Sequence, residues 1–140
     1  MQAQLSGLFL KINIQEINMK NMLIVEDDIL LQKVMRRNFK GDFEMDFCES
    51  KVEYYEKYSN KKYDIIIMDI SLKGSGNGLE LIKEIKAEPA FTGTSILCLT
   101  AHAQTKMRQT AIDSGSDLFI TKPVTNRVLK DAIEFLLKSA

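Results

Sequence analysis

The amino-acid sequence predicts one α/β domain, a doubly wound (βα)5 arrangement with five parallel strands. Five short segments are largely apolar, the first of them continuously so, and each is followed by a segment with helical spacing. Strands that are apolar throughout need cover on both faces, which is how parallel sheets are built. The length of 140 residues suits one domain with one sizeable core.

The predicted strands are Met22–Val25, Met45–Cys48, Ile65–Met68, Ser95–Leu99 and Leu118–Thr121. Apolar residues at helical spacing predict a first helix, which ends by Gly41: Ile29, Leu30, Val34, Met35 and Phe39. Further helices are predicted at 51–58, at 79–86 before Pro89, and up to about Ser114, where Gly115 suits a left-handed C-cap. The apolar stripe of the last helix is Val128, Leu129, Ala132, Ile133, Leu136 and Leu137.

Composition limits the function classes. Lys plus Arg equals Asp plus Glu at 19 each, so neither a nucleic acid nor a membrane surface is expected as the main partner. No apolar run approaches the roughly 20 residues of a membrane span, and no secretory signal is recognisable. Cys48 and Cys98 lie far apart in apolar segments, which favours buried free thiols in a reducing cytoplasm.

Polar residues follow four of the predicted strands. Glu26 and Asp27 come after the first strand, Asp69 after the third, Thr100 after the fourth and Lys122 after the fifth. In doubly wound sheets ligands bind beyond the carboxyl ends of the strands, where the winding reverses. These five residues are therefore predicted to form one site.

Clustered carboxylates repel one another unless a cation lies among them, and Mg²⁺ prefers a few carboxylates plus a phosphoryl oxygen. The Lys122 ammonium would bring such a site close to neutral, and Asp69 could then act as the nucleophile in phosphoryl transfer. Taken singly, each residue also has a structural explanation. Asp27 or Asp28 could cap the first helix, and Thr100 could cap the fourth.

Four ordered motifs resemble the response-regulator receiver domains of two-component signalling. "MLIVEDD" resembles the first strand and acid pair of that family, "YDIIIMDISL" its phosphoacceptor strand, "SILCLTAHA" its fourth strand and "LFITKP" its Lys-Pro strand end. The resemblance covers about 20–137 and implies a flavodoxin-like sheet with strand order 2-1-3-4-5. It also implies a signalling domain whose catalysis is confined to its own phosphorylation and slow dephosphorylation.

The resemblance implies a role for each site residue. Asp27 would bind Mg²⁺ directly, Glu26 would support it through water, Asp69 would bind it and be phosphorylated, and the Ser71 carbonyl would complete the site. The hydroxyl of Thr100 would hydrogen-bond to the phosphoryl group.

Further positions match the family, and two of them, Lys73 and Phe119, depart from its commonest residue type. Lys122 would pair with Asp69 or its phosphate, and its bond to Pro123 resembles the cis-proline of the family, although a trans bond at a helix start is the alternative. Phe119 takes the switch-aromatic position without a hydroxyl, and a static core residue is the alternative. Ser71 and His102 occupy the positions that tune phosphate lifetime. Lys73 replaces a frequent proline, in a loop that is one residue longer than usual.

The resemblance also implies partners. His102, the single histidine, is expected to be solvated, so the phosphodonor would be a sensor histidine kinase or a histidine phosphotransfer protein. The output would be a changed surface on the fourth helix, fifth strand and fifth helix, which carries Met107, Phe119 and Leu129 and would bind a downstream target protein. A relay intermediate that passes the phosphoryl group on is the alternative, and the expected state is a monomer or weak dimer in the cytoplasm.

The sequence disfavours three rival functions. A nucleotide or flavin site is disfavoured because the glycines of "GSGNG" follow the third strand and lack the fingerprint spacing. A phosphohydrolase is disfavoured because Ser71 stands where a general-acid aspartate is needed, and a receiver that is never phosphorylated would not need the full set of matching residues. Residues 1–19 precede the receiver domain, 20–140, as an extra edge strand, a linker remnant or the product of a misplaced start before Met19 or Met22.

Overall fold

A computed structural model describes residues 19–70, 78–91, 93–101 and 105–139. Its centre is a five-stranded parallel sheet in the order β2-β1-β3-β4-β5, which confirms the predicted fold class and strand order. The strands are β1 (Lys20–Val25), β2 (Phe43–Cys48), β3 (Ile65–Asp69), β4 (Ser95–Thr100) and β5 (Leu118–Thr121).

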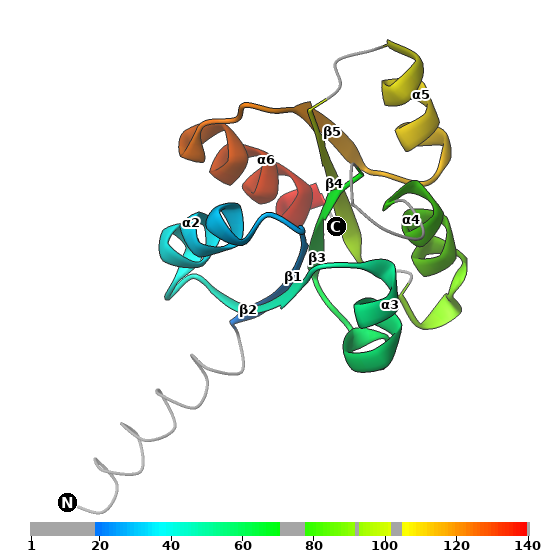
Figure 1. The fold of residues 1–140 in the computed structure, drawn as a ribbon, viewed down its shortest axis with the longest axis horizontal. Helices are drawn as coiled ribbons and strands as arrows, with labels where there is room; N and C mark the ends of the chain where they lie inside the picture. Colours follow the sequence, from blue (N-terminus) through cyan, green and yellow to red (C-terminus); the bar gives the residue numbers. More distant parts are fainter. Residues whose placement is uncertain (1–18, 71–77, 92, 102–104, 140) are drawn as a thin grey trace, which may run out of the picture.

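Helices cover both faces of this sheet. Figure 1 shows α2 and α6 on one side and α3, α4 and α5 on the other. The helical segments are α2 (Ile29–Phe39), α3 (Lys51–Glu53), the π-helix η1 (Tyr54–Tyr58), α4 (Gly78–Ala87), the 3-10 helix η2 (Pro89–Phe91), α5 (Thr105–Asp113) and α6 (Asn126–Ser139). None of the described helices is both long and apolar enough to cross a membrane.

The doubly wound arrangement explains why the central strands are apolar at successive positions. Side chains alternate between the two faces of a strand, so Leu23 and Val25 join the core under α3 and α4, while Met22 and Ile24 join the core under α2 and α6. All five residues of β3 are buried. The sheet is therefore held between two separate apolar layers.

The prediction of which residues of the first helix are buried was wrong in part. Met35 and Phe39 are buried in α2, but Leu30 is 73% exposed, and Ile29 and Val34 are also exposed. The face toward the sheet instead includes Gln32, whose amide donates a hydrogen bond to the Glu26 carbonyl. The helix is therefore rotated so that its polar Gln32 holds the loop after β1.

Other details also differ from the prediction. The segment predicted as one helix at 51–58 is a single α-helical turn followed by the wider η1. β2 begins two residues earlier than predicted because Phe43 pairs with Lys20 of β1. Val128 of α6 is 50% exposed, because the sheet is contacted by Leu129 and the residues that follow at helical spacing.

Two turns need glycine. Gly41 and Gly115 have φ angles of 89° and 110°, in the left-handed region that side chains with a Cβ disfavour. Gly115 follows α5, which confirms the predicted C-cap, and Gly41 connects α2 to β2. The predictions for residues 1–18 lie outside the described residues.

Candidate phosphoacceptor and metal site

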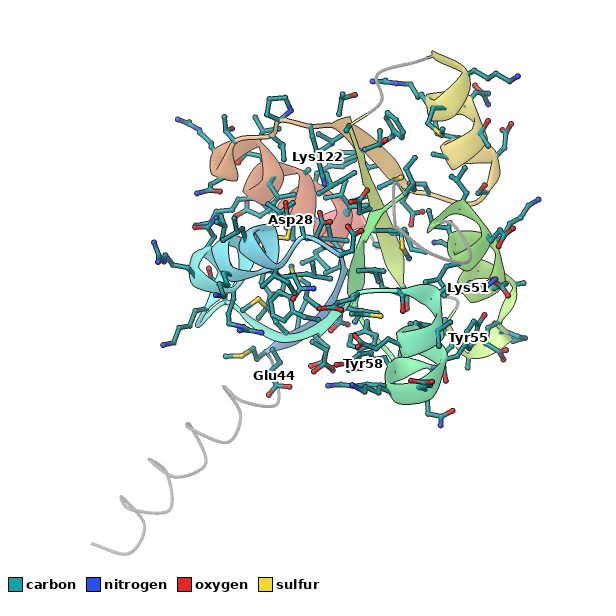
Figure 2. The ribbon with its side chains drawn as sticks, viewed as in Figure 1. Asp28, Glu44, Lys51, Tyr55, Tyr58 and Lys122 are labelled. Carbon is teal, nitrogen blue, oxygen red and sulfur yellow. The ribbon has the colours of Figure 1, made fainter. Side chains whose placement is uncertain are left out.

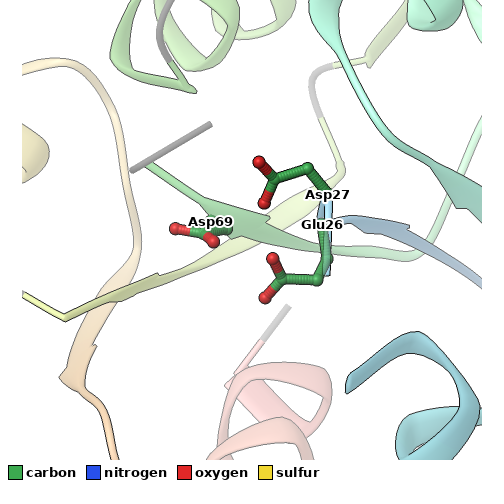
Figure 3. A group of neighbouring side chains, drawn as sticks. All are labelled: Glu26, Asp27 and Asp69. Carbon is green, nitrogen blue, oxygen red and sulfur yellow. The ribbon is translucent and has the colours of Figure 1, made fainter. Parts of the chain in front are cut away.

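Three carboxylates meet where β1 and β3 end. Glu26 and Asp27 directly follow β1, Asp69 is the last residue of β3, and the parallel register pairs Val25 with Met68. Figure 3 shows all three carboxylates directed toward a common space. One oxygen from each lies within 4.8 Å of the others. The structure thus brings together the three acids that the sequence predicted.

A lysine from the fifth strand reaches the same place. Lys122 follows β5, and its backbone amide donates to the Thr100 carbonyl at 2.7 Å, which continues the ladder between β4 and β5. Its Nζ atom lies 2.8 Å from Glu26 Oε1 and 3.1 Å from Asp69 Oδ2. The Lys122–Pro123 peptide bond is cis, as the resemblance implied. One ammonium group therefore joins two carboxylates from different strands.

Burial gives this site unusual electrostatics. Glu26 is only 2% exposed and Asp69 is 4% exposed. Burial, together with the nearby Asp69, raises the pKa of Glu26 from 4.5 to about 7, although Lys122 opposes the rise. Burial tends to lower the pKa of Lys122, but its hydrogen bond to Glu26 and the charge of Asp69 raise that pKa overall. The site therefore favours an ammonium and gains from added positive charge.

The local sequence fixes the Glu26 carboxylate. Its Oε2 accepts a hydrogen bond from the Asp28 amide at 3.2 Å, and the Glu26 amide donates to the Cys48 carbonyl at 2.8 Å. Asp28 is the N-cap of α2, and its Oδ1 accepts from the amides of Leu30 and Leu31. Between the two predicted cap candidates the structure selects Asp28, which leaves Asp27 at the acid cluster.

The acid cluster fits a hard divalent cation. Its potential ligands are carboxylate oxygens, which Mg²⁺ prefers over nitrogen or sulfur. Two of the three acids are buried, so they gain more from a compensating cation than surface carboxylates do. The donor set and its burial therefore suit Mg²⁺.

Thr100 lies on β4, which pairs with β3, and Phe119 lies on β5, which pairs with β4. Thr100 is the last residue of β4, one position beyond Leu99, which pairs with Asp69, and it is fully buried. Since α5 begins at Thr105, Thr100 does not immediately precede that helix. Phe119 in β5 is 8% exposed, with the Arg108 guanidinium 5.4 Å from its ring centroid. Ser71 and His102 lie outside the described residues.

Sequence reasoning missed two residues that shape the site. Gln32 holds the Glu26 carbonyl, and a glutamine on an apolar helix face was the available signal. Gly78 opens α4 so close to β3 that a Cβ atom there would lie 2.6 Å from the Asp69 carbonyl oxygen and 2.8 Å from Ile70 Cα. A glycine is therefore needed where α4 passes the end of β3.

Comparison with known proteins gives consistent matches. The family model described as response regulator receiver domain matches residues 22–134. The chemotaxis protein CheY of Halobacterium salinarum is 32% identical over 119 residues, which cover 84% of this chain and 97% of that protein.

The regulatory protein VanRB of Enterococcus faecalis is also 32% identical, over 84% of this chain but 51% of its own length. The chain thus spans about half the length of that relative. Among solved structures, a CheY-like receiver domain protein from Methanospirillum hungatei superposes with a TM-score of 0.78 at 25% identity, covering 87% of this chain and 96% of that one.

Proposed function

Because the chain belongs to the family of response regulator receiver domains, we propose that it is a signalling switch that accepts a phosphoryl group on Asp69. The donor would be a phosphohistidine of a sensor histidine kinase or of a histidine phosphotransfer protein. Phosphorylation-dependent signalling follows from family membership, whereas the acceptor residue, the donor and the output surface are the proposal.

The meeting of three carboxylates and one ammonium at the end of β3 carries this proposal. Asp69 is buried, yet it borders the Glu26 and Asp27 carboxylates and lies 3.1 Å from the Lys122 Nζ atom. A buried acid cluster costs folding free energy, so its presence favours a role that uses the negative charge. Phosphoryl transfer onto a carboxylate is such a role.

Glu26, Asp27 and Asp69 would hold Mg²⁺, with the Ser71 carbonyl as a further ligand. When bound, the ion would supply positive charge beside the phosphoryl oxygens, which offsets the repulsion between an incoming phosphate and the acids. Lys122 would add a second positive charge to the same oxygens.

In the proposed step an Asp69 carboxylate oxygen attacks phosphorus, and the new P–O bond forms as the P–N bond of the donor breaks. The donor imidazole keeps the electron pair of that bond and takes up a proton, which leaves an acyl phosphate on Asp69. Lys122 would move from its pairing with the Asp69 carboxylate to the phosphoryl group. The Thr100 hydroxyl would donate a hydrogen bond to a phosphoryl oxygen.

The output would be a change in the face formed by α5, β5 and α6. Thr100 and Phe119 lie on adjacent strands, and Phe119 packs under Arg108 of α5. If Thr100 shifts toward the phosphoryl group, Phe119 can move into the space behind it and draw α5 along. A downstream protein would read that face. Ser71 and His102 are proposed to tune the lifetime of the phosphoryl group.

Phosphoramidate, which has a P–N bond like that of phosphohistidine, provides the test. Intact mass spectrometry after incubation with phosphoramidate and Mg²⁺ is expected to show one added phosphoryl group, absent in Asp69→Asn. Unmodified wild-type protein, or equal modification of Asp69→Asn, would contradict the proposal. Transfer from the labelled chain to a histidine phosphotransfer protein would separate a relay intermediate from a terminal switch.

A further inference from the structure

A buried amide on α2 holds the loop that carries two of the three acids. Gln32 is 8% exposed, and the other buried residues of α2 are Met35 and Phe39. These two side chains are apolar and pack in the core beneath α2 and α6. A polar side chain on such a face costs free energy unless it is hydrogen-bonded, and an apolar residue there would avoid that cost. Packing alone therefore does not explain a glutamine at this position.

Gln32 contacts the loop after β1 twice. Its side-chain Nε2 atom donates a hydrogen bond to the Glu26 carbonyl, six residues back along the chain. Its backbone amide donates to the Asp28 carbonyl at 3.0 Å, which begins the hydrogen bonding of α2. Figure 2 shows Asp28 at the start of α2, on the side of the molecule where Lys122 lies. One residue therefore joins the helix to the loop that carries the acids.

The carbonyl that Gln32 binds belongs to the peptide group between Glu26 and Asp27. The next peptide group, between Asp27 and Asp28, is held through the Asp28 amide, which donates to Glu26 Oε2 at 3.2 Å. The Glu26 amide donates in turn to the Cys48 carbonyl at 2.8 Å. The peptide groups on both sides of Asp27 are thus hydrogen-bonded, and Gln32 supplies the bond on the side nearer to β1.

This bond bears on the directions of the acid side chains. A peptide group is planar, so the loop can change shape only through its φ and ψ angles. Rotation of the peptide group between Glu26 and Asp27 changes ψ of Glu26 and φ of Asp27, which orient the two side chains. A buried carbonyl needs a donor for structural reasons alone. A donor at this carbonyl also fixes two members of the acid cluster.

Mg²⁺ is sensitive to freedom in its ligands, and Ca²⁺ is less so. Mg²⁺ requires nearly ideal octahedral geometry with oxygens at about 2.0–2.1 Å, whereas Ca²⁺ accepts about six to eight oxygens at about 2.3–2.6 Å in flexible arrangements. Residues that orient metal ligands without touching the metal typically change affinity by about 10- to 100-fold. A loosened loop should therefore weaken Mg²⁺ binding more than Ca²⁺ binding.

We propose that Gln32 is a positioning residue for the metal site, and that its hydrogen bond to the Glu26 carbonyl sets the preference of the site for Mg²⁺ over Ca²⁺. This role rests on the proposed function, because it takes the acid cluster as the group that holds the ion. It adds to that function the residue that fixes the loop and the property that the bond controls, which is metal selectivity.

Gln32→Met tests this role, because methionine has nearly the same length and flexibility but no donor. Titrations of the full chain with Mg²⁺ and with Ca²⁺, followed by amide NMR, give the two dissociation constants. Mg²⁺ binding by Gln32→Met is expected to be about tenfold weaker than that of the wild type. Ca²⁺ binding should weaken by less than about threefold. Unchanged Mg²⁺ binding, or an equal loss for both ions, would overturn the proposal.

Met35→Ala is the matched control, because Met35 lies on the same buried face of α2 and packs in the apolar core. It should lower the free energy of unfolding and leave both dissociation constants unchanged. If Met35→Ala reduced the selectivity for Mg²⁺ as much as Gln32→Met, loosening of α2 in general would account for the effect. The positioning role of Gln32 would then be overturned.

The side-chain amide of Gln32 gives a second readout in the wild type. Its protons should exchange with water more slowly than those of Gln109, which is exposed on α5. Mg²⁺ should slow them further, because the coupling between the bond and the bound ion is reciprocal. Exchange as fast as that of Gln109, with or without Mg²⁺, would show that the bond is absent in solution and would overturn the proposal.

Failure of this role can be told from failure of the proposed function. If the wild type binds Mg²⁺ and accepts a phosphoryl group while Gln32→Met keeps the selectivity of the wild type, only the role of Gln32 is overturned. If the wild type neither binds Mg²⁺ nor accepts a phosphoryl group, both are overturned. A loss of selectivity confined to Gln32→Met is the result expected.

Discussion

At the scale of the residue, Lys122 carries the positive charge shared by two buried carboxylates. Its Nζ atom is within 3.1 Å of both Glu26 and Asp69, so its removal leaves these acids without the ammonium that offsets them. Preorganised charges beside a reacting group commonly contribute factors of 10² to 10³ in rate. The effect of Lys122 on phosphorylation should therefore be large.

We expect Lys122→Ala to slow phosphorylation by phosphoramidate about 100-fold. The rate is measured by intact mass spectrometry at saturating Mg²⁺. Lys61→Ala is the control, because Lys61 pairs with Asp46 at 2.8 Å in a surface ion pair away from the site. Equal rates for Lys122→Ala and the wild type would exclude the role assigned to this ammonium.

Glu26 should make the stability of the metal-free protein depend on pH. Its folded pKa is raised from 4.5 to about 7, so the folded state binds the proton more tightly than the unfolded state does. Its contribution to the free energy of unfolding is fully present below pH 4.5 and is lost as pH rises through 7. That loss is roughly 3 kcal/mol, at about 1.4 kcal/mol per unit of pKa shift.

Urea unfolding in the presence of a chelator, at a series of pH values, measures this loss. Glu26→Gln should show a flatter decline between pH 5 and pH 8, and Mg²⁺ should restore stability to the wild type at pH 8. A wild-type curve parallel to that of Glu26→Gln would mean that Glu26 titrates as an exposed glutamate does.

At the scale of the element, the close approach of α4 to β3 depends on Gly78. A Cβ atom at this position would lie 2.6 Å from the Asp69 carbonyl oxygen, and the backbone must move to relieve that contact. Gly78→Ala should therefore destabilise the fold by about 2 kcal/mol or more and slow phosphorylation of Asp69. Thermal unfolding and the phosphoramidate rate measure the two effects.

The matched glycine is Gly93, whose added Cβ would meet only the Lys62 Nζ atom, at 3.9 Å. Gly93→Ala should leave the phosphorylation rate unchanged and shift stability by less than about 1 kcal/mol. If both alanine variants behaved alike, the contact between α4 and the end of β3 would not be what requires glycine at position 78.

The orientation of α2 yields a further contrast. Met35 is 2% exposed and packs under the sheet, so Met35→Ala should cost about 2–4 kcal/mol. Leu30 is 73% exposed, and Leu30→Ala should change stability by less than about 0.5 kcal/mol. Urea unfolding measures both, and a large loss in Leu30→Ala would show that its side chain is buried in solution.

The α2 helix also shows a feature that the sequence did not predict, namely which of its faces contacts the sheet. Short, largely apolar segments identified all five strands, because the strands of a parallel sheet that is covered on both faces are rich in apolar residues. The first turn of α2 is apolar on more than one face, so spacing did not determine which face contacts the sheet. The hydrogen bond from Gln32 to the Glu26 carbonyl decides it, and such a bond follows from packing in three dimensions.

The candidate site was also predicted from the sequence only in part. Glu26, Asp27, Asp69 and Lys122 were predicted to meet because parallel strands bring their carboxyl ends to one edge. The Lys122 bond to Glu26, shorter than its bond to Asp69, depends on side-chain rotamers and on the burial of both acids. Sequence spacing carries no information on either.

At the scale of the whole molecule, the sheet gathers the site residues at one edge. The carboxyl ends of the strands carry the acid cluster and Lys122, and α2 contacts the same loop through Gln32. The proposed signalling output uses a second region, the face of α5, β5 and α6. The proposed switch depends on Asp69 as the phosphoryl acceptor.

Chemical mapping of the phosphoryl group tests that claim most directly. The protein is phosphorylated with phosphoramidate and Mg²⁺, and borohydride then reduces the acyl phosphate so that the modified aspartate becomes homoserine. Peptide mass spectrometry is predicted to find homoserine at position 69 alone, and only when Mg²⁺ is present. Homoserine at position 27, or no conversion at position 69, would contradict the account.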